Sequence, residues 1–261
     1  MVGRPLPFVL EHGLKVSKDA QFETPRSWAH GGYLCMGDLR AQWLRERYHC
    51  KARAIGPWIK YAECILDAST LQELRQQLGR TLLVVLAHNW DRANRSMDLP
   101  ACIDAVQNVA RVHQFSTVIW LRHWLDPTEL PLPQKWLVAC NGHRSNPWFL
   151  DSLRTLMELS DGLISNSFGT HIGYAASLDK ELHWIHNTAQ QDLSRLQPAQ
   201  AERERDEWDC RTTIGHEMSA LLDRYGHQCA ENSALMKLLN PFWGFDQLKS
   251  SSELRHILTA K

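Results

Sequence analysis

The sequence lacks any long hydrophobic run. Its longest strongly apolar stretch covers residues 81–87, which is far shorter than the roughly 20 residues that a membrane-spanning helix requires. The first residues also lack the pattern of a secretory signal peptide, because their apolar stretch is short and interrupted by prolines. We therefore expect a cytoplasmic protein, and an association with the inner face of the membrane stays open.

An excess of charge of one sign is also lacking. Lys and Arg together number 29, and Asp and Glu also number 29, so the formal net charge is zero. Proteins that bind nucleic acid without sequence preference usually carry a basic excess. The charge balance therefore argues against nucleic acid as a partner.

The seven cysteines include no CxxC pair. Structural zinc sites and thioredoxin-like redox motifs usually contain such pairs. His183 and His186 form an HxxH motif, but they lie in a predicted strand, where residues three apart point to opposite faces. The sequence thus predicts reduced, mostly buried thiols and no metal site.

Tryptophan and histidine are abundant, with 11 and 13 copies in 261 residues. Tryptophan offers large amphipathic contact surfaces of the kind that suit sugars, and ordinary core packing is the alternative interpretation. The length, with 44% hydrophobic residues, allows one large domain or two small ones.

Strands and helices are expected to alternate regularly from about residue 79 to residue 190. The apolar strands do not alternate with polar residues, which is typical of a parallel sheet covered by helices on both faces. We therefore predict an α/β fold with a Rossmann-like parallel sheet flanked by helices. The expected strands cover 81–89, 116–124, 135–142, 161–167 and 181–186, and the expected helices cover 101–114, 147–160 and 169–178.

Three parts are predicted along the chain. Residues 1–78 are expected to form a reduced N-terminal α/β part on the acceptor side, and residues 79–190 a Rossmann-like donor-binding core. Residues 191–261 are expected to form a helical segment that packs back on the body. The highly charged stretch 190–209 is interpreted as a solvated helix or a linker.

Polar clusters follow four of the predicted strands, at 88–91, 122–126, 141–144 and 165–171. Ligands of parallel sheets bind at the carboxyl ends of the strands, so we expect these clusters to meet at one rim and to form the site. Histidines from the clusters are candidates for acid–base chemistry near neutral pH. The catalytic candidates are Asp91, as base or nucleophile, together with His88, His123 and His12, the last from the N-terminal part.

The fourth cluster has the layout of an anion site, because a strand, a short turn and a helix follow one another. The free N–H groups and the dipole of a helix amino end attract phosphate, and Gly169 lets it approach the backbone. A simple helix cap by Asn166 or Ser167 is the alternative interpretation. The predicted phosphate-binding residues are Ser165, Asn166, Ser167, Gly169, Thr170 and His171, with Arg144 and Gly142 from the third cluster.

The segment SDGLISNSFGTHIGYAASLDKELHW, residues 160–184, resembles the donor-binding motif of GT-B glycosyltransferases. In that motif a strand ends in a turn of small residues, a helix follows, and a short step leads to the next strand. The segments HGL (12–14) and AIGPWIKYA (54–62) also resemble pieces of bacterial surface-polysaccharide transferases of this fold.

The resemblance implies a metal-independent glycosyltransferase of polysaccharide biosynthesis. Its substrates would be a nucleotide-sugar donor and a glycan or lipid-linked glycan acceptor, with no cofactor. Many such enzymes carry a Glu that binds the donor ribose, whereas this chain has Tyr174 at the matching place. The turn at 165–171 is more similar to those of transferases that use CMP-linked acidic sugars.

Two other functions stay open at this point. One is a non-catalytic nucleotide- or glycan-binding subunit that acts as the partner of a larger transferase. The other is a sugar-nucleotide epimerase with the same architecture.

Overall fold

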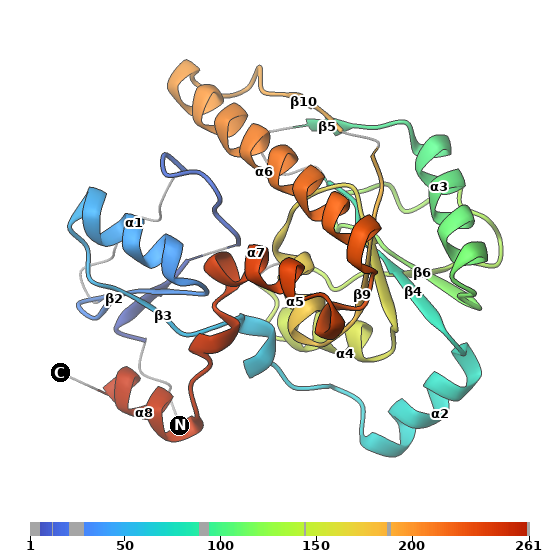
Figure 1. Ribbon diagram of the computed structural model, residues 1–261, viewed down its shortest axis with the longest axis horizontal. Coiled ribbons are helices and arrows are strands. Elements are labelled where there is room, and N and C mark those ends of the chain that lie inside the picture. The colour runs from blue at the N-terminus through green and yellow to red at the C-terminus, as the bar shows by residue number, and fades with distance from the viewer. Residues whose placement is uncertain are drawn as a thin grey trace.

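The computed structural model describes residues 6–11, 13–20, 29–88, 94–143, 145–186 and 189–259. Two parallel sheets lie side by side, a small one near the N-terminus and a larger one formed by the middle of the chain (Figure 1). The long C-terminal helix α6 and the shorter α7 lie beside them and connect the two parts.

The small sheet has the order β1-β2-β3, and both of its strand pairs are parallel. Its strands are β1 (Phe8–Leu10), β2 (Gly32–Cys35) and β3 (Ala52–Ala54), and α1 (Asp38–Tyr48) connects β2 to β3. Gly32 has a φ of +89°, and a Cβ there would lie 2.2 Å from the backbone oxygen of Lys51. Only glycine therefore permits the close approach of β2 and β3 at this point.

The larger sheet confirms the predicted Rossmann-like core, because all five expected strands form and all pair in parallel. The strand order is β7-β6-β4-β8-β9. The chain builds outward from β4 on one side, then returns to add β8 and β9 on the other. The switch point between β4 and β8 is where ligands of such sheets bind. The strands are β4 (Thr81–Val84), β6 (Thr117–Leu121), β7 (Leu137–Ala139), β8 (Gly162–Ser165) and β9 (Glu181–Trp184).

Helices cover both faces of the larger sheet, as predicted. Leu82 and Val84 of β4 pack towards α3, whereas Leu83 between them packs towards α4 and α5, so successive strand residues enter two separate hydrophobic clusters. The three helices are α3 (Leu99–Val112), α4 (Phe149–Glu158) and α5 (Thr170–Ser177). Helix α2 (Ala68–Leu78), capped by Asp67, precedes β4.

Helix α4 begins two residues later than the sequence predicted. The helix was expected from residue 147, but the side-chain oxygen of Asn146 accepts from the backbone N–H of Trp148 at 3.1 Å, within a turn that precedes the helix. The side chain thus stabilises the turn rather than the first helical residues.

The C-terminal part consists of α6 (Pro198–Tyr225), α7 (Ser233–Trp243) and α8 (Ser251–Thr259). The interpretation of 190–209 as a solvated helix or linker holds for most of this stretch, because α6 begins at Pro198 and most residues up to 209 are not buried, but α6 also buries Ala201 and Glu207. Trp243 of α7 is fully buried, and its ring occupies the space where Gly173 of α5 would carry a Cβ. Leu254 of α8 packs against the small sheet, close to the N-terminus in Figure 1.

Shorter elements complete the fold. Strands β5 (Asn94–Ser96) and β10 (Gln190–Asp192) form an antiparallel pair. Three 3₁₀ helices span Trp58–Tyr61, Cys229–Glu231 and Phe245–Gln247.

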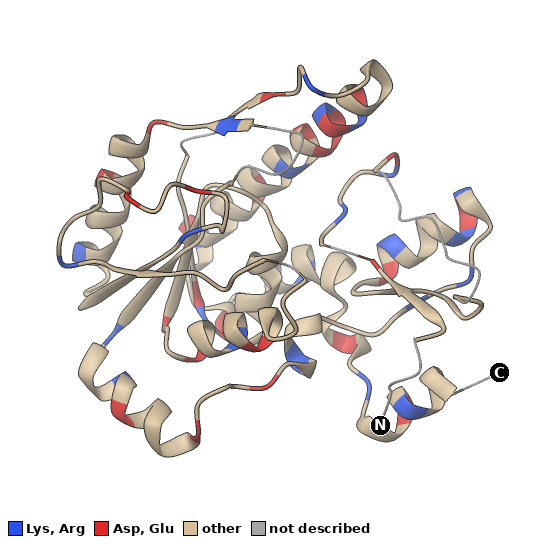
Figure 2. Ribbon diagram, turned by 180° about the vertical axis from the view of Figure 1, so that it is seen from behind, with Lys and Arg blue, Asp and Glu red and all other residues tan. Residues whose placement is uncertain are grey.

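The surface and the thiols agree with the composition. Figure 2 shows Lys and Arg interspersed with Asp and Glu, most clearly along α6. The cysteines are free thiols, but only Cys35, Cys102 and Cys229 are buried, whereas three others are half-buried and Cys140 is exposed, so the prediction of mostly buried thiols holds only in part. Across the described ranges, no helix combines the length and the apolar character needed to cross a membrane.

Candidate functional site

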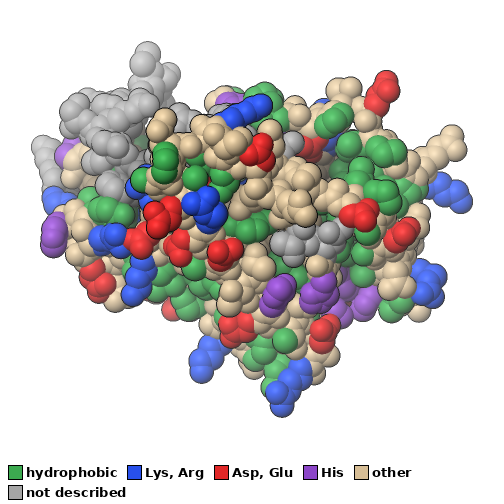
Figure 3. Space-filling model, turned by 90° about the horizontal axis from the view of Figure 1, so that it is seen from above, with side chains coloured by type: hydrophobic (Ala, Val, Ile, Leu, Met, Phe, Trp, Pro, Cys, Tyr) green, Lys and Arg blue, Asp and Glu red, His purple; other side chains and the backbone are tan. Residues whose placement is uncertain are grey.

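Three of the four polar strand ends meet at the carboxyl edge of the larger sheet. The rings of His88, after β4, and His123, after β6, stack with their centroids 3.9 Å apart. Trp124 lies beside His123, and its ring is nearly perpendicular to that of His143, after β7, with the ring centroids 4.8 Å apart. We call His88, His123, Trp124 and His143 the strand-end row. Figure 3 shows histidine side chains gathered on one face of the molecule.

The fourth strand end connects to this row through His171. Its Nε2 lies 2.8 Å from the hydroxyl of the buried Ser165, which also accepts from the backbone N–H of Ser167 at 3.1 Å. Burial of the imidazole, with smaller effects of His88 and the Arg211 cation, lowers the pKa of His171 to about 3. His171 is therefore neutral at physiological pH and lies close enough to His88 to interact electrostatically.

Two of the predicted phosphate-binding side chains make structural contacts at the switch point. The side-chain oxygen of Asn166 accepts from the backbone N–H of Ala87 at 2.8 Å, and so connects the ends of β8 and β4. The hydroxyl of Thr170 accepts from the backbone N–H of Leu14 at 3.0 Å. Both side chains hold loops in position around the amino end of α5.

Packing and backbone conformation also explain why glycine stands at the two predicted glycine positions. A Cβ on Gly169 would lie 2.6 Å from the ring of His171, so glycine lets the imidazole fold back over the turn. Gly142 has a φ of +78°, in the left-handed region that favours glycine, and lies beside Asn146. Gly142 therefore shapes the turn that leads into α4.

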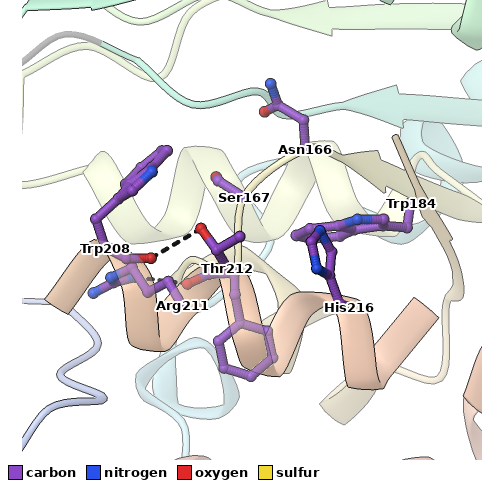
Figure 4. Close-up of a pocket in the computed structure, with 8 residues that line it drawn as sticks. Asn166, Ser167, Trp184, Trp208, Arg211, Thr212 and His216 are labelled. Atoms are coloured by element: carbon purple, nitrogen blue, oxygen red, sulfur yellow. Dashed lines mark hydrogen bonds between the residues drawn. The ribbon is translucent and has the colours of Figure 1, made fainter. Parts of the chain in front are cut away.

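A small pocket lies between the ends of β8 and β9 and helix α6 (Figure 4). Its volume of about 10 Å³ has room for a single water molecule. Trp184 and His216 lie at one end, and Trp208 and Arg211 at the other. The indole Nε1 of Trp184 is buried and has no hydrogen-bond partner among the described residues. The lining residues are Asn166, Ser167, Phe168, Trp184, Trp208, Arg211, Thr212 and His216.

Arg211 of α6 is fixed at the turn before α5. Its guanidinium donates to the backbone oxygen of Phe168 at 2.6 Å, to the backbone oxygen of Leu14, and to Glu207 at 2.8 Å. Glu207 in turn accepts from the backbone N–H groups of Val16, at 3.0 Å, and Ser17, at 2.8 Å. The Glu207–Arg211 pair thus anchors the segment after β1 against the carboxyl edge of the larger sheet.

A second guanidinium, that of Arg95 on β5, lies at the same place. It donates to the backbone oxygen of His88 at 3.1 Å and lies over the ring of Trp208, 4.6 Å from the centroid. Burial, together with the positive charge of Arg211, lowers the pKa of Arg95 to about 10. Two cations that disfavour each other's charge would both be stabilised by a bound anion.

Sequence reasoning missed Arg95, Trp208, Arg211 and His216. The last three lie on α6. The sequence of this helix is so highly charged that it does not indicate which side of the helix is buried. Glu207 and Arg211, four residues apart on a helix, were the available signal, because that spacing places a cation and an anion together.

The other residues that the sequence analysis named either lie outside the described ranges or lie away from this site. Asp91, His12 and Arg144 lie outside the described residues. Tyr174 is a core residue with 3% exposure and does not reach the site. His183 and His186 belong to separate groups, as their strand spacing predicted, and His186 contacts Ser219 at 3.2 Å.

No protein-family model matches the chain, and a search of curated proteins found no match. Among solved structures, the chain is similar to the wall teichoic acid polymerase TagF in a structure with CDPG. The sequence identity is 12% and the TM-score is 0.47, over 87% of this chain and 56% of that chain. The chain therefore spans little more than half the length of that polymerase chain.

Proposed function

We propose that this protein is a glycosyltransferase that moves a sugar from a nucleotide-activated donor to a glycan acceptor. The observation that carries the proposal is the meeting of Arg95, Arg211 and the amino end of α5 at the switch point between β4 and β8. This arrangement suits a phosphate-containing ligand, because guanidinium groups and helix amino ends both stabilise phosphate.

The donor would enter between α6 and the ends of β8 and β9. The flat faces of Trp184 and Trp208 offer contacts for a nucleobase or a sugar ring. The buried Nε1 of Trp184 offers a donor for which the described residues supply no acceptor. Because the pocket holds about one water molecule, we expect donor binding to move α6 or the side chains that it contributes.

The chemistry would begin with attack of an acceptor hydroxyl on the anomeric carbon. The hydroxyl oxygen forms a bond to that carbon and gives its proton to His88, while the bond from carbon to the phosphate oxygen breaks. Negative charge then develops on the departing nucleotide, where Arg95, Arg211 and the α5 amino end stabilise it. In this proposal these groups, rather than a metal ion, take the leaving-group charge.

His88 is the better base, because it is exposed at the carboxyl edge, where an acceptor can reach it. His171 has a pKa of about 3 and is therefore a weak base. His123 stacks on His88 and would hold its ring in place. Asp91, outside the described residues, remains a second candidate for the base.

We further propose a CMP-linked acidic sugar as the donor and a lipid-linked or free surface glycan as the acceptor. The enzyme would work in the cytoplasm, at the inner face of the membrane, without a cofactor and without nucleic acid. These assignments come from the sequence resemblance. The nucleotide-binding and transfer assays that identify the donor also test them.

The test measures binding of CMP, UDP, GDP and CDP by calorimetry, followed by transfer and hydrolysis assays with the matching sugar donors. We expect one nucleotide to bind, and Arg95→Gln to weaken it by at least about tenfold. His88→Asn should keep binding and lose turnover. Arg255→Gln, on the exposed side of α8, is the matched control and should change neither.

Each alternative predicts a different result. Binding of a nucleotide without any turnover supports the non-catalytic partner subunit. A new nucleotide sugar formed without acceptor supports the epimerase. Nucleotide binding that Arg95→Gln leaves intact would contradict the proposed phosphate site.

A further inference from the structure

A second group of histidines lies beside the edge strand β9, away from the pocket. His113 follows α3, His183 lies on β9, and His227 follows α6. Their ring centroids are 4.4 to 4.8 Å apart, and one ring nitrogen from each histidine lies within 4.8 Å of those of the other two. We call these three residues the histidine cluster. Three imidazoles from distant parts of the chain therefore converge on one point.

The cluster contains a nitrogen that the protein leaves unsatisfied. The side chain of His183 is 1% exposed, and its Nε2 is buried without a hydrogen-bond partner among the described residues. An unpaired buried polar atom destabilises the folded protein. Such an atom is well explained by a ligand that the chain itself does not supply.

His227 is oriented as metal-binding histidines usually are. Its Nδ1 lies 2.8 Å from the backbone oxygen of Leu182, to which it donates, so its Nε2 carries the free lone pair. Metal-binding histidines generally donate their other ring N–H to a carbonyl or a carboxylate in this way. The tautomer of His227 is thus set for coordination through Nε2.

A carboxylate lies at a distance that suits a fourth ligand. Oε2 of Glu181 is 3.5 Å from Nε2 of His183, a long polar contact at the outer limit of a hydrogen bond. Two ligands of one tetrahedral zinc ion, each about 2.1 Å from it, lie roughly 3.4 Å apart. The other oxygen of Glu181 accepts from Arg80 at 2.5 Å, which would fix the carboxylate.

We propose that His113, His183, His227 and Glu181 bind one zinc ion in a structural site. To reach tetrahedral ligand spacing, the most distant ligand nitrogens must approach by about 1.4 Å, and the stacked rings of His183 and His227 must turn relative to each other. This inference does not depend on the proposed transferase activity.

The ion would tie the C-terminal part of the chain to the larger sheet. Residues 227 and 228 pair with the start of β9, through a hydrogen bond from the Leu182 N–H to the His227 backbone oxygen at 3.0 Å and a bridge between Glu181 and Gln228. α6 contributes Arg211 and Trp208 to the pocket, so an ion just beyond its C-terminus would hold that helix in place.

The test uses the full chain without a polyhistidine tag, freed of metal with a chelator. Cobalt(II) serves as the visible probe, and zinc is then added to displace it. We expect one equivalent of cobalt to bind with the intense visible bands of a tetrahedral ion. Zinc should remove these bands and raise the melting temperature of the protein.

The variants are His113→Gln and His227→Gln, since both residues are half-buried and their replacement disturbs the core less than a change at His183. Each should lower cobalt affinity at least about tenfold and abolish the zinc-induced rise in melting temperature. Glu181→Gln should weaken binding less. His256→Gln, on the exposed surface of α8, is the matched control.

Far-ultraviolet circular dichroism without metal verifies that each variant is folded. The proposal is overturned if the wild-type chain binds no stoichiometric cobalt. It is also overturned if folded His113→Gln and His227→Gln variants bind cobalt as tightly as the wild type.

Discussion

The two groups of histidines differ in what surrounds them. In the strand-end row, His88 is exposed, and two guanidinium groups, a helix amino end and two indoles lie nearby. In the histidine cluster, the central imidazole is buried and a carboxylate is the closest charged group. Guanidinium groups beside a helix amino end suit an anionic substrate, whereas imidazole nitrogens beside a carboxylate suit a cation. The same residue type thus serves opposite chemistry, and its neighbours decide which.

The largest expected effect is the loss of turnover when His88 is replaced. This substitution tests whether the strand-end row and the histidine cluster act independently. Replacing His88 by Asn should reduce turnover by about 10²–10⁴-fold, the usual contribution of a general base, while cobalt binding stays unchanged. Steady-state kinetics and a cobalt titration on the same preparation measure both. Loss of cobalt binding in this variant would mean that the two groups are not independent.

The next prediction concerns Glu207, whose 10% exposed side chain accepts hydrogen bonds from backbone N–H groups of the N-terminal segment and pairs with Arg211. Glu207→Ala should lower the free energy of unfolding by about 3 kcal/mol, because it leaves a partly buried guanidinium without its anion. Urea denaturation measures the change. Glu202→Ala, exposed on the same helix, should cost less than about 0.5 kcal/mol. Equal effects of the two substitutions would contradict the anchoring role.

A pH experiment tests the burial of His171. Its pKa is about 3 in the folded protein and close to 6.5 when unperturbed. Between these values the unfolded chain binds a proton that the folded protein does not, so stability falls as the pH is lowered below about 6.5. We expect the loss between about pH 7 and pH 5 to be smaller for His171→Asn than for the wild type, by about 2 kcal/mol.

The control for this measurement is His256→Asn, which changes an exposed histidine. Urea denaturation at both pH values gives the free energies of unfolding. An unchanged pH dependence in His171→Asn would show that His171 is protonated in the folded protein as readily as in the unfolded chain.

The smallest effect is expected at Thr170. Its hydroxyl accepts from the Leu14 N–H, so Thr170→Val should cost about 1 kcal/mol of stability through one lost hydrogen bond. It should weaken nucleotide binding only slightly, because the contact positions a loop. A loss of nucleotide affinity much greater than tenfold would instead give the hydroxyl a direct role with the donor.

Much of the larger sheet was predictable because its strands are unbroken apolar runs between amphipathic helices. The runs that begin at Thr81 and Thr117 form β4 and β6 as expected, and the polar residues that follow them meet at one edge. The start of α4 was misplaced, because the Asn146 side chain bonds within its own turn, a choice between two local hydrogen-bond patterns that sequence spacing does not resolve.

The site was only partly predictable. The turn at Ser165 and the histidines His88 and His123 lie where the strand ends placed them. Arg95 and Arg211 were not foreseen, because one lies on a short strand after the first polar cluster and the other on a helix with a highly charged sequence. Their shared position depends on how α6 packs across the sheet, which no local pattern encodes.

The sequence by itself determined the alternation of strands and helices, the parallel sheet, and the polar residues at its carboxyl edge. These follow from hydrophobic periodicity and from the common direction of parallel strands, which are local properties of the chain. Only the tertiary structure decided that Arg211 reaches the turn before α5, and that His113, His183 and His227 meet. Such contacts join residues far apart in the chain, and their formation depends on the packing of whole elements rather than on local sequence.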